Sequence, residues 1–166
     1  MRSQDLAAVL GSLLQGRVVF LGIGSEWRRD DQAGAFLARS LPCGPRFFPI
    51  EAGDVPEAFT GPVKEYGPDV ILIADAVNFG SEPGDIALFD AEEVKLKRFN
   101  THHPSLRTLI DYLRAETAAK VAIIGIQPGD VGWGQELTPA VHESVCLLRA
   151  LISELLGKTS DEGATT

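Results

Sequence analysis

Apolar and polar residues alternate along the chain in blocks that predict strands and helices in turn. A largely apolar run begins at Val18 and breaks at Gly22 and Gly24, and similar runs occupy residues 70–77 and 120–126. Such continuous runs are typical of strands buried on both faces of a sheet. Segments with apolar residues at helical spacing lie between them and predict amphipathic helices. These segments are 3–14, 31–41, 55–66 (interrupted at 61–62), 106–113 and 138–156.

Two further segments have the character of edge strands. Residues 46–52 contain Pro49, which favours the edge of a sheet because proline lacks a backbone N–H. Residues 85–89 alternate and are compatible with a short antiparallel edge strand. The alternation of strands and helices predicts a three-layer α/β/α fold with a mostly parallel central sheet. We expect one domain over residues 1–156 and a flexible C-terminal tail over 157–166.

Composition narrows the class of protein. The chain has 166 residues, 45% of them hydrophobic, and a formal net charge of −8. This charge argues against a nucleic-acid partner or an anionic membrane surface. No segment is long and apolar enough to predict a membrane span, and the N-terminus lacks the apolar core of a signal peptide, so we expect a cytoplasmic protein. Cys43 and Cys146 form no CxxC motif.

Acidic and histidine side chains gather where the predicted strands end. Asp30 and Asp31 follow the first strand, and Asp75 ends the third. In a sheet of flavodoxin-like order these two strands are neighbours, so their carboxyl ends meet at the switch point where ligands bind. The pair His102-His103 lies in a loop that could reach the same edge. Two carboxylates and an imidazole suit a divalent metal such as nickel or zinc, and they also suit general acid–base chemistry.

Each of these residues also has a plain structural interpretation. Asp30 or Asp31 could cap the helix that follows, and Asp75 could accept N–H bonds from its own loop. Either histidine of the pair could be an ordinary surface residue, and His142 is expected to be structural or exposed in the last helix. A dinucleotide-binding function is disfavoured because Trp27 stands where the fingerprint needs a third glycine.

Four stretches together form a family signature. They are GIGS at 22–25 through DDQAG at 30–34, IADA at 73–76 with PG at 83–84, TH at 101–102, and GIQP at 125–128 with VG at 131–132. Over about residues 17–156 the chain resembles the hydrogenase maturation proteases, endopeptidases that trim the C-terminal extension from the large subunit of a nickel–iron hydrogenase. The last stretch resembles in particular the branch that processes hydrogenases of the formate-hydrogenlyase kind.

The resemblance implies a ligand set and a partner. By position, the nickel-contacting acid of the family falls on Asp31, its second acid on Asp75 and its histidine on His102, with His103 as the alternative histidine. It further implies that nickel is supplied by the hydrogenase large-subunit precursor and is not permanently bound to the protease. A carboxylate, Asp31 or its neighbour Asp30, would act as general base.

The chain also departs from the family pattern in the first loop. The usual Asn is Ser25, a common Leu is Trp27, and the glycine after the acid pair is Gln32. Two other functions fit the same residues. One is a chaperone that binds the metallated precursor without cutting it, and the other is a metal-dependent hydrolase of a different kind on the same scaffold.

Overall fold

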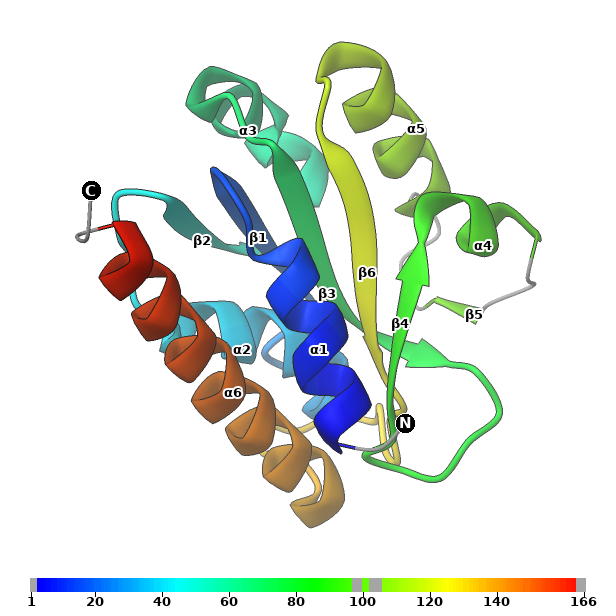
Figure 1. Ribbon diagram of the computed structural model, residues 1–166. Helices are drawn as coiled ribbons and strands as arrows, with labels where there is room; N and C mark the ends of the chain where they lie inside the picture. The colour runs from blue at the N-terminus through cyan, green and yellow to red at the C-terminus, as the bar shows by residue number, and fades with distance from the viewer. Residues whose placement is uncertain (1–2, 97–99, 102–105, 164–166) are drawn as a thin grey trace.

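The computed structural model describes residues 3–96, 100–101 and 106–163, in which strands and helices alternate (Figure 1). The strands are β1 (Val18–Ile23), β2 (Phe47–Gly53), β3 (Val70–Asn78), β4 (Ile86–Asp90), β5 (Asn100–Thr101) and β6 (Lys120–Ile126). The α-helices are α1 (Ser3–Leu13), α2 (Ala33–Ser40), α3 (Thr60–Tyr66), α4 (Ala91–Leu96), α5 (Leu106–Glu116) and α6 (Pro139–Gly163). Two short 3-10 helices are η1 (Arg29–Gln32) and η2 (Pro56–Phe59).

The sheet has the order β2-β1-β3-β6-β4, with β5 paired to the end of β3. The pairs β1/β2, β1/β3 and β3/β6 are parallel, whereas β4 is antiparallel to β6. The predicted mostly parallel sheet with an antiparallel edge strand is therefore confirmed. Pro49 lies on β2 at the other edge, as expected, and the first and third strands are neighbours.

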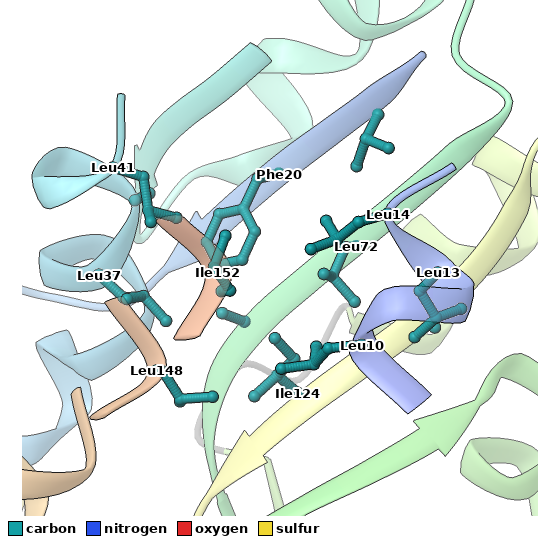
Figure 2. Packing of buried hydrophobic residues seen from close by; sticks show 14 of the residues in the cluster. Leu10, Leu13, Leu14, Phe20, Leu37, Leu41, Leu72, Ile124, Leu148 and Ile152 are labelled. Atoms are coloured by element: carbon teal, nitrogen blue, oxygen red, sulfur yellow. The ribbon is translucent and has the colours of Figure 1, made fainter. Parts of the chain in front are cut away.

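Helices cover both faces of the sheet. Successive residues of β1 point to opposite faces, with Val18 and Phe20 in one buried cluster and Val19 and Leu21 in the other. Helices α1, α2 and α6 contribute to the first cluster, and α3, α4 and α5 to the second. Both faces are thus buried, which explains the continuous apolar runs. Figure 2 shows part of the first cluster, to which different elements contribute Leu10, Phe20, Leu37, Leu72, Ile124 and Leu148.

The structure corrects the expected boundaries of several elements. Helix α3 begins at Thr60, so residues 61–62 do not interrupt it; Pro62 lies in the first turn, where its missing N–H removes no helical bond. Helix α6 continues to Gly163, so residues 157–163, expected in the flexible tail, are helical instead. Leu155 and Leu156 pack against the core just before this extension and anchor it.

No helix within the described ranges is both long and apolar enough to cross a membrane.

Close contact between backbones sets the start of α2 against the carboxyl ends of β1 and β3. A Cβ atom on Gly34 would lie 2.0 Å from the carbonyl oxygen of Ala74, and one on Gly24 would lie 1.7 Å from that of Asp31. Gly24 also has a φ of +137°, a backbone conformation that residues other than glycine rarely adopt. These two glycines let the first loop and α2 pack directly beside β3, where Asp75 follows Ala74.

We expect Gly34→Ala to lower the free energy of unfolding by about 2–3 kcal/mol, because the added methyl group must displace backbone atoms. Gly157→Ala is the matched control, since no atom lies within 4 Å of its added Cβ. Within the exposed part of α6 this change should raise stability by about 0.5–1 kcal/mol. Urea denaturation of both variants measures the difference. A neutral Gly34→Ala would contradict the tight packing of α2 on β3.

Candidate active site

Asp31 and Asp75 lie near each other beside the carboxyl end of β1, close enough for the charge of one to affect the other. Gly22 pairs with Ala74 in these parallel strands, so Asp75 lies level with the end of β1. Asp31 belongs to η1 in the loop that follows β1, and it is partly buried. Its Oδ2 atom accepts a hydrogen bond of 3.1 Å from the backbone N–H of Ser25. Strand β3 continues to Asn78, so Asp75 lies inside the strand and not at its end as predicted.

Asp75 is a buried acid with an unpartnered oxygen. Its side chain is 1% exposed, and among the described residues its Oδ2 atom has no hydrogen-bond partner. Burial raises the pKa of Asp75 well above its usual value, and the negative charge of Asp31 raises this pKa further. The backbone N–H of Ala76 opposes these effects only in part. An orphaned acceptor next to a second carboxylate is the arrangement that an incoming cation or proton would stabilise.

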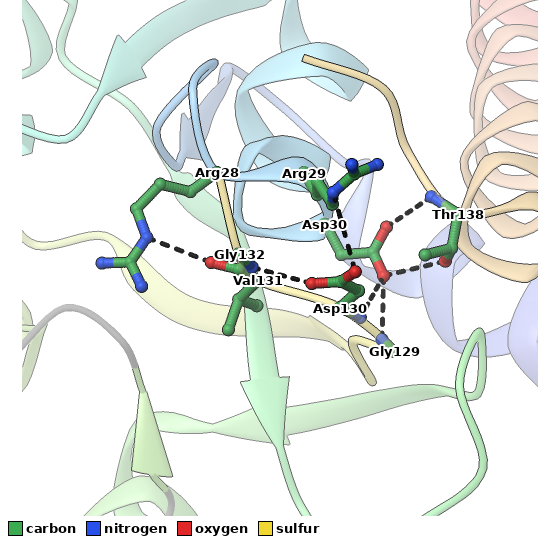
Figure 3. A network of polar contacts seen from close by, with 8 residues as sticks. All are labelled: Arg28, Arg29, Asp30, Gly129, Asp130, Val131, Gly132 and Thr138. Carbon is green, nitrogen blue, oxygen red and sulfur yellow. Dashed lines mark hydrogen bonds and ion pairs between the residues drawn. The ribbon is translucent and has the colours of Figure 1, made fainter. Parts of the chain in front are cut away.

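Asp30, the other acid of the pair, is fully buried and has a different role in the fold (Figure 3). Its Oδ2 atom accepts bonds from the backbone N–H groups of Gly129 and Asp130 and from the hydroxyl of Thr138, at 2.8, 3.0 and 2.8 Å. Its Oδ1 atom accepts the backbone N–H of Thr138 at 2.7 Å. The carboxylate thus lies at the N-terminus of α6, where the helix dipole favours negative charge.

Further bonds join the loop after β1 to the loop after β6. The N–H of Arg29 donates to the carbonyl of Gly134, and the N–H of Gly134 donates to that of Trp27, each at 2.9 Å. The side chain of Arg28 reaches the carbonyl of Val131 at 3.1 Å, as Figure 3 shows. The two loops therefore form one hydrogen-bonded unit around Asp30, and Asp31 is held at its margin.

Gln127 has a structural role that its place in the GIQP stretch did not predict. It is buried at the end of β6, and its Oε1 atom accepts the N–H groups of Phe79 and Ser81 at 3.0 and 3.2 Å. Its Nε2 atom donates to the side chain of Asn78 at 3.2 Å. Gln127 therefore fixes the loop that follows β3. A polar residue directly after an apolar strand was the available signal.

The described part of the structure contains one of the three histidines, His142. His102 and His103 lie outside it. His142 is exposed on α6, with its ring against the edge of Phe36 at a centroid distance of 6.4 Å. Within the described part of the chain no group of three or more His, Cys, Asp and Glu side chains is placed to hold a metal ion. Of the predicted ligand set, Asp31 and Asp75 are the members that lie within the described residues.

Solved proteins share this architecture. The crystal structure of a [NiFe] hydrogenase maturation protease HycI from Thermococcus kodakarensis KOD1 matches with a TM-score of 0.81 and 30% identity, covering 90% of this chain and 99% of that chain. The solution structure of an endopeptidase HycI from Escherichia coli matches with a TM-score of 0.71 and 27% identity, covering 83% and 90%. The doubly wound sheet and these matches define a class of enzyme, an endopeptidase of α/β fold.

Sequence comparison gives the family. The family model described as HycI, hydrogenase maturation protease, matches residues 45–154. The hydrogenase 3 maturation protease of Escherichia coli K12 is 32% identical over 130 residues, which cover 76% of this chain and 83% of the relative. The chain belongs to the hydrogenase maturation protease family. The resemblance drawn from the four signature stretches is confirmed, and so is the prediction of a peptide hydrolase.

The two neighbouring acids should respond differently to truncation. We expect Asp30→Ala to lower the free energy of unfolding by about 3 kcal/mol, because it leaves the donors of Gly129, Asp130 and Thr138 without their acceptor. Asp31→Ala loses one bond in a partly exposed site and should cost less than about 1 kcal/mol. Urea denaturation at neutral pH compares them. Equal losses would mean that Asp31 is structural as well.

Asp75 should make stability depend on pH. Because its folded pKa is raised, the native state holds a proton that the unfolded chain releases, so its contribution is complete below the ordinary carboxyl value. That contribution is lost as the pH rises toward the folded pKa, by up to about 1.4 kcal/mol per pH unit. We expect denaturation in chelator-treated buffers from pH 4 upward to show a decline that is smaller in Asp75→Asn. Parallel curves for the two proteins would contradict the burial of a protonated Asp75.

Proposed function

We propose that this protein removes the C-terminal extension of a [NiFe] hydrogenase large-subunit precursor after nickel has been inserted, and that it recognises the bound nickel. Membership in the hydrogenase maturation protease family supports the class of substrate. The nickel part is supported by the buried Oδ2 atom of Asp75, which has no partner among the described residues and lies beside the carboxylate of Asp31. In this proposal nickel is part of the substrate and not a resident cofactor.

Electrostatics gives a physical reason for selecting the loaded precursor. Leaving a carboxyl oxygen buried without a partner is unfavourable, and a nearby like charge adds to this penalty. A nickel ion carried into the site by the precursor would give Asp75 the partner that it lacks among the described residues, and would offset the repulsion from Asp31. An empty precursor offers no such compensation. The two acids would therefore act as a checkpoint for metal loading.

In this proposal three residues bind the nickel, and one of them also acts as the general base. Asp31 and Asp75 contact the nickel through their carboxylate oxygens, and His102 supplies a nitrogen ligand, the set that nickel accepts in proteins. The nickel would polarise the adjacent peptide carbonyl or activate a water molecule. Asp31 is the better general base of the acid pair, because the bonds that Asp30 already accepts occupy its buried carboxylate.

A processing assay tests the proposal directly. Purified protein is mixed with a large-subunit precursor, with and without nickel, and intact mass spectrometry reads the C-terminus. We expect cleavage only of the loaded precursor. Asp31→Asn and His102→Ala should lower the rate by about 100-fold or more, because each removes a group that contacts the reacting centre.

His142→Ala is the matched control, since this histidine is exposed on α6 and should be dispensable. Cleavage of both precursor forms would keep the protease but overturn nickel recognition by Asp31 and Asp75. No cleavage of a loaded precursor would overturn the proposed substrate. A His142→Ala variant without activity would displace the site assignment.

A further inference from the structure

Two tryptophan side chains stand exposed beside the candidate site. Trp133 is 82% exposed and Trp27 is 53% exposed, and they are the two tryptophans of the chain. Trp27 lies in the loop after β1 and Trp133 in the loop after β6. A large aromatic ring left in water forgoes the burial that it would gain at an interface. Both rings therefore mark this edge of the molecule as a surface for a partner.

The backbone that presents these rings is held in place. Gly134, next to Trp133, donates its N–H to the carbonyl of Trp27 at 2.9 Å and accepts the N–H of Arg29 at the same distance. A β-bridge also joins Arg28 and Gly134. Less conformational freedom is lost on binding when the backbone is already fixed, so more of the burial energy is available for affinity. Tryptophans presented in this way are typical hot spots of protein interfaces.

A groove continues from Trp27 toward the site. It has a volume of about 350 Å³ and lies between α2 and the end of β2. Its apolar wall is formed by Trp27, Phe36, Val55 and Phe59, and Val55 is 56% exposed. The groove also reaches Ser25, whose backbone N–H holds the carboxylate of Asp31. Trp27 and Asp31, the candidate nickel contact, thus belong to the same loop.

We propose that Trp27, Trp133 and this groove form the docking surface for the hydrogenase large-subunit precursor, an inference that rests on the proposed function. Contacts between two acids and one metal ion bury little area, whereas a specific protein complex buries about 800 Å² on each partner. The additional area must come from surface adjoining Asp31. The two rings and the apolar wall of the groove provide exposed apolar surface near Asp31, so the occupant is an apolar segment of the precursor beside the scissile bond.

Cleavage kinetics provide the first test. Trp27→Ala and Trp133→Ala should each raise KM for the loaded precursor by about 30-fold, with kcat unchanged, because the rings bind the substrate without touching the reacting bond. Tyr112→Ala is the matched control, because Tyr112 is an aromatic residue that is 40% exposed on α5. Helix α5 leads to the start of β6, at the end of the sheet away from the candidate site. Its KM should equal that of the wild type.

A spectroscopic readout tests docking without turnover. Because the chain has two tryptophans, the 5-fluorotryptophan-labelled Asp31→Asn variant should give two fluorine resonances. We expect both to shift when the loaded precursor is added, and neither to depend on protein concentration in its absence. Resonances that shift with concentration alone would assign the surface to a second copy of this chain and overturn the proposal.

The two hypotheses fail in different ways. Wild-type cleavage with unchanged KM in both tryptophan variants would overturn the docking surface and leave the proposed function standing. Absence of cleavage by the wild type would overturn the proposed function, and the docking surface with it. A loss of kcat at constant KM in the tryptophan variants would place the rings in the reaction itself and would also overturn docking.

Discussion

The buried carboxylate of Asp30 holds together the two loops on which the rest of the site depends. It accepts bonds from Gly129, Asp130 and Thr138, so one side chain fixes both the loop after β6 and the start of α6. These bonds are shielded from water, which makes an unmade one expensive and the arrangement well defined. The position of Asp31, one residue further along, follows from this bracing.

Neighbouring acids of the same type have opposite tasks here because their surroundings differ. Asp30 is surrounded by donors and contributes to folding. Asp31 accepts one backbone bond from the described residues, which leaves the rest of its carboxylate available to them. Asp75 is buried beside it, and one of its oxygens has no partner in the part of the chain that the structure describes, a local arrangement that is unfavourable. Such a cost is tolerated in proteins where it serves a site, and the close packing of Gly24 and Gly34 helps to hold the two acids together.

The sequence predicts those parts of the structure that depend on local patterns. Apolar runs identify the buried strands, and Pro49 identifies an edge, because these signals depend on a few adjacent residues. The distinction between Asp30 and Asp31 could not be predicted, since the partners of Asp30 lie about one hundred positions away. Gly157 suggested an end for α6, but the packing of Leu155 and Leu156 outweighs the modest cost of one glycine in a helix.

The region between β4 and α5 also contains structure that the local sequence pattern did not predict. Residues 90–100 have a charged composition that suggests simple surface, yet α4 forms there and buries Ala91 and Val94 against the second core cluster. Two buried side chains are too few to give a clear helical period. His102, the remaining member of the predicted ligand set, lies outside the described residues, so its placement at the edge of the sheet stays a prediction.

The bond between Thr138 and Asp30 spans 108 positions of the chain, and this separation has a consequence for biosynthesis. Contacts so distant in sequence form late, because loop closure must precede them. A ribosome releases Asp31 and Asp75 long before the segment that braces their loop has been made. The newly made N-terminal part therefore lacks the bonds that order the loop carrying Asp31. The loop that carries Asp31 should therefore become ordered only after the start of α6 has been made.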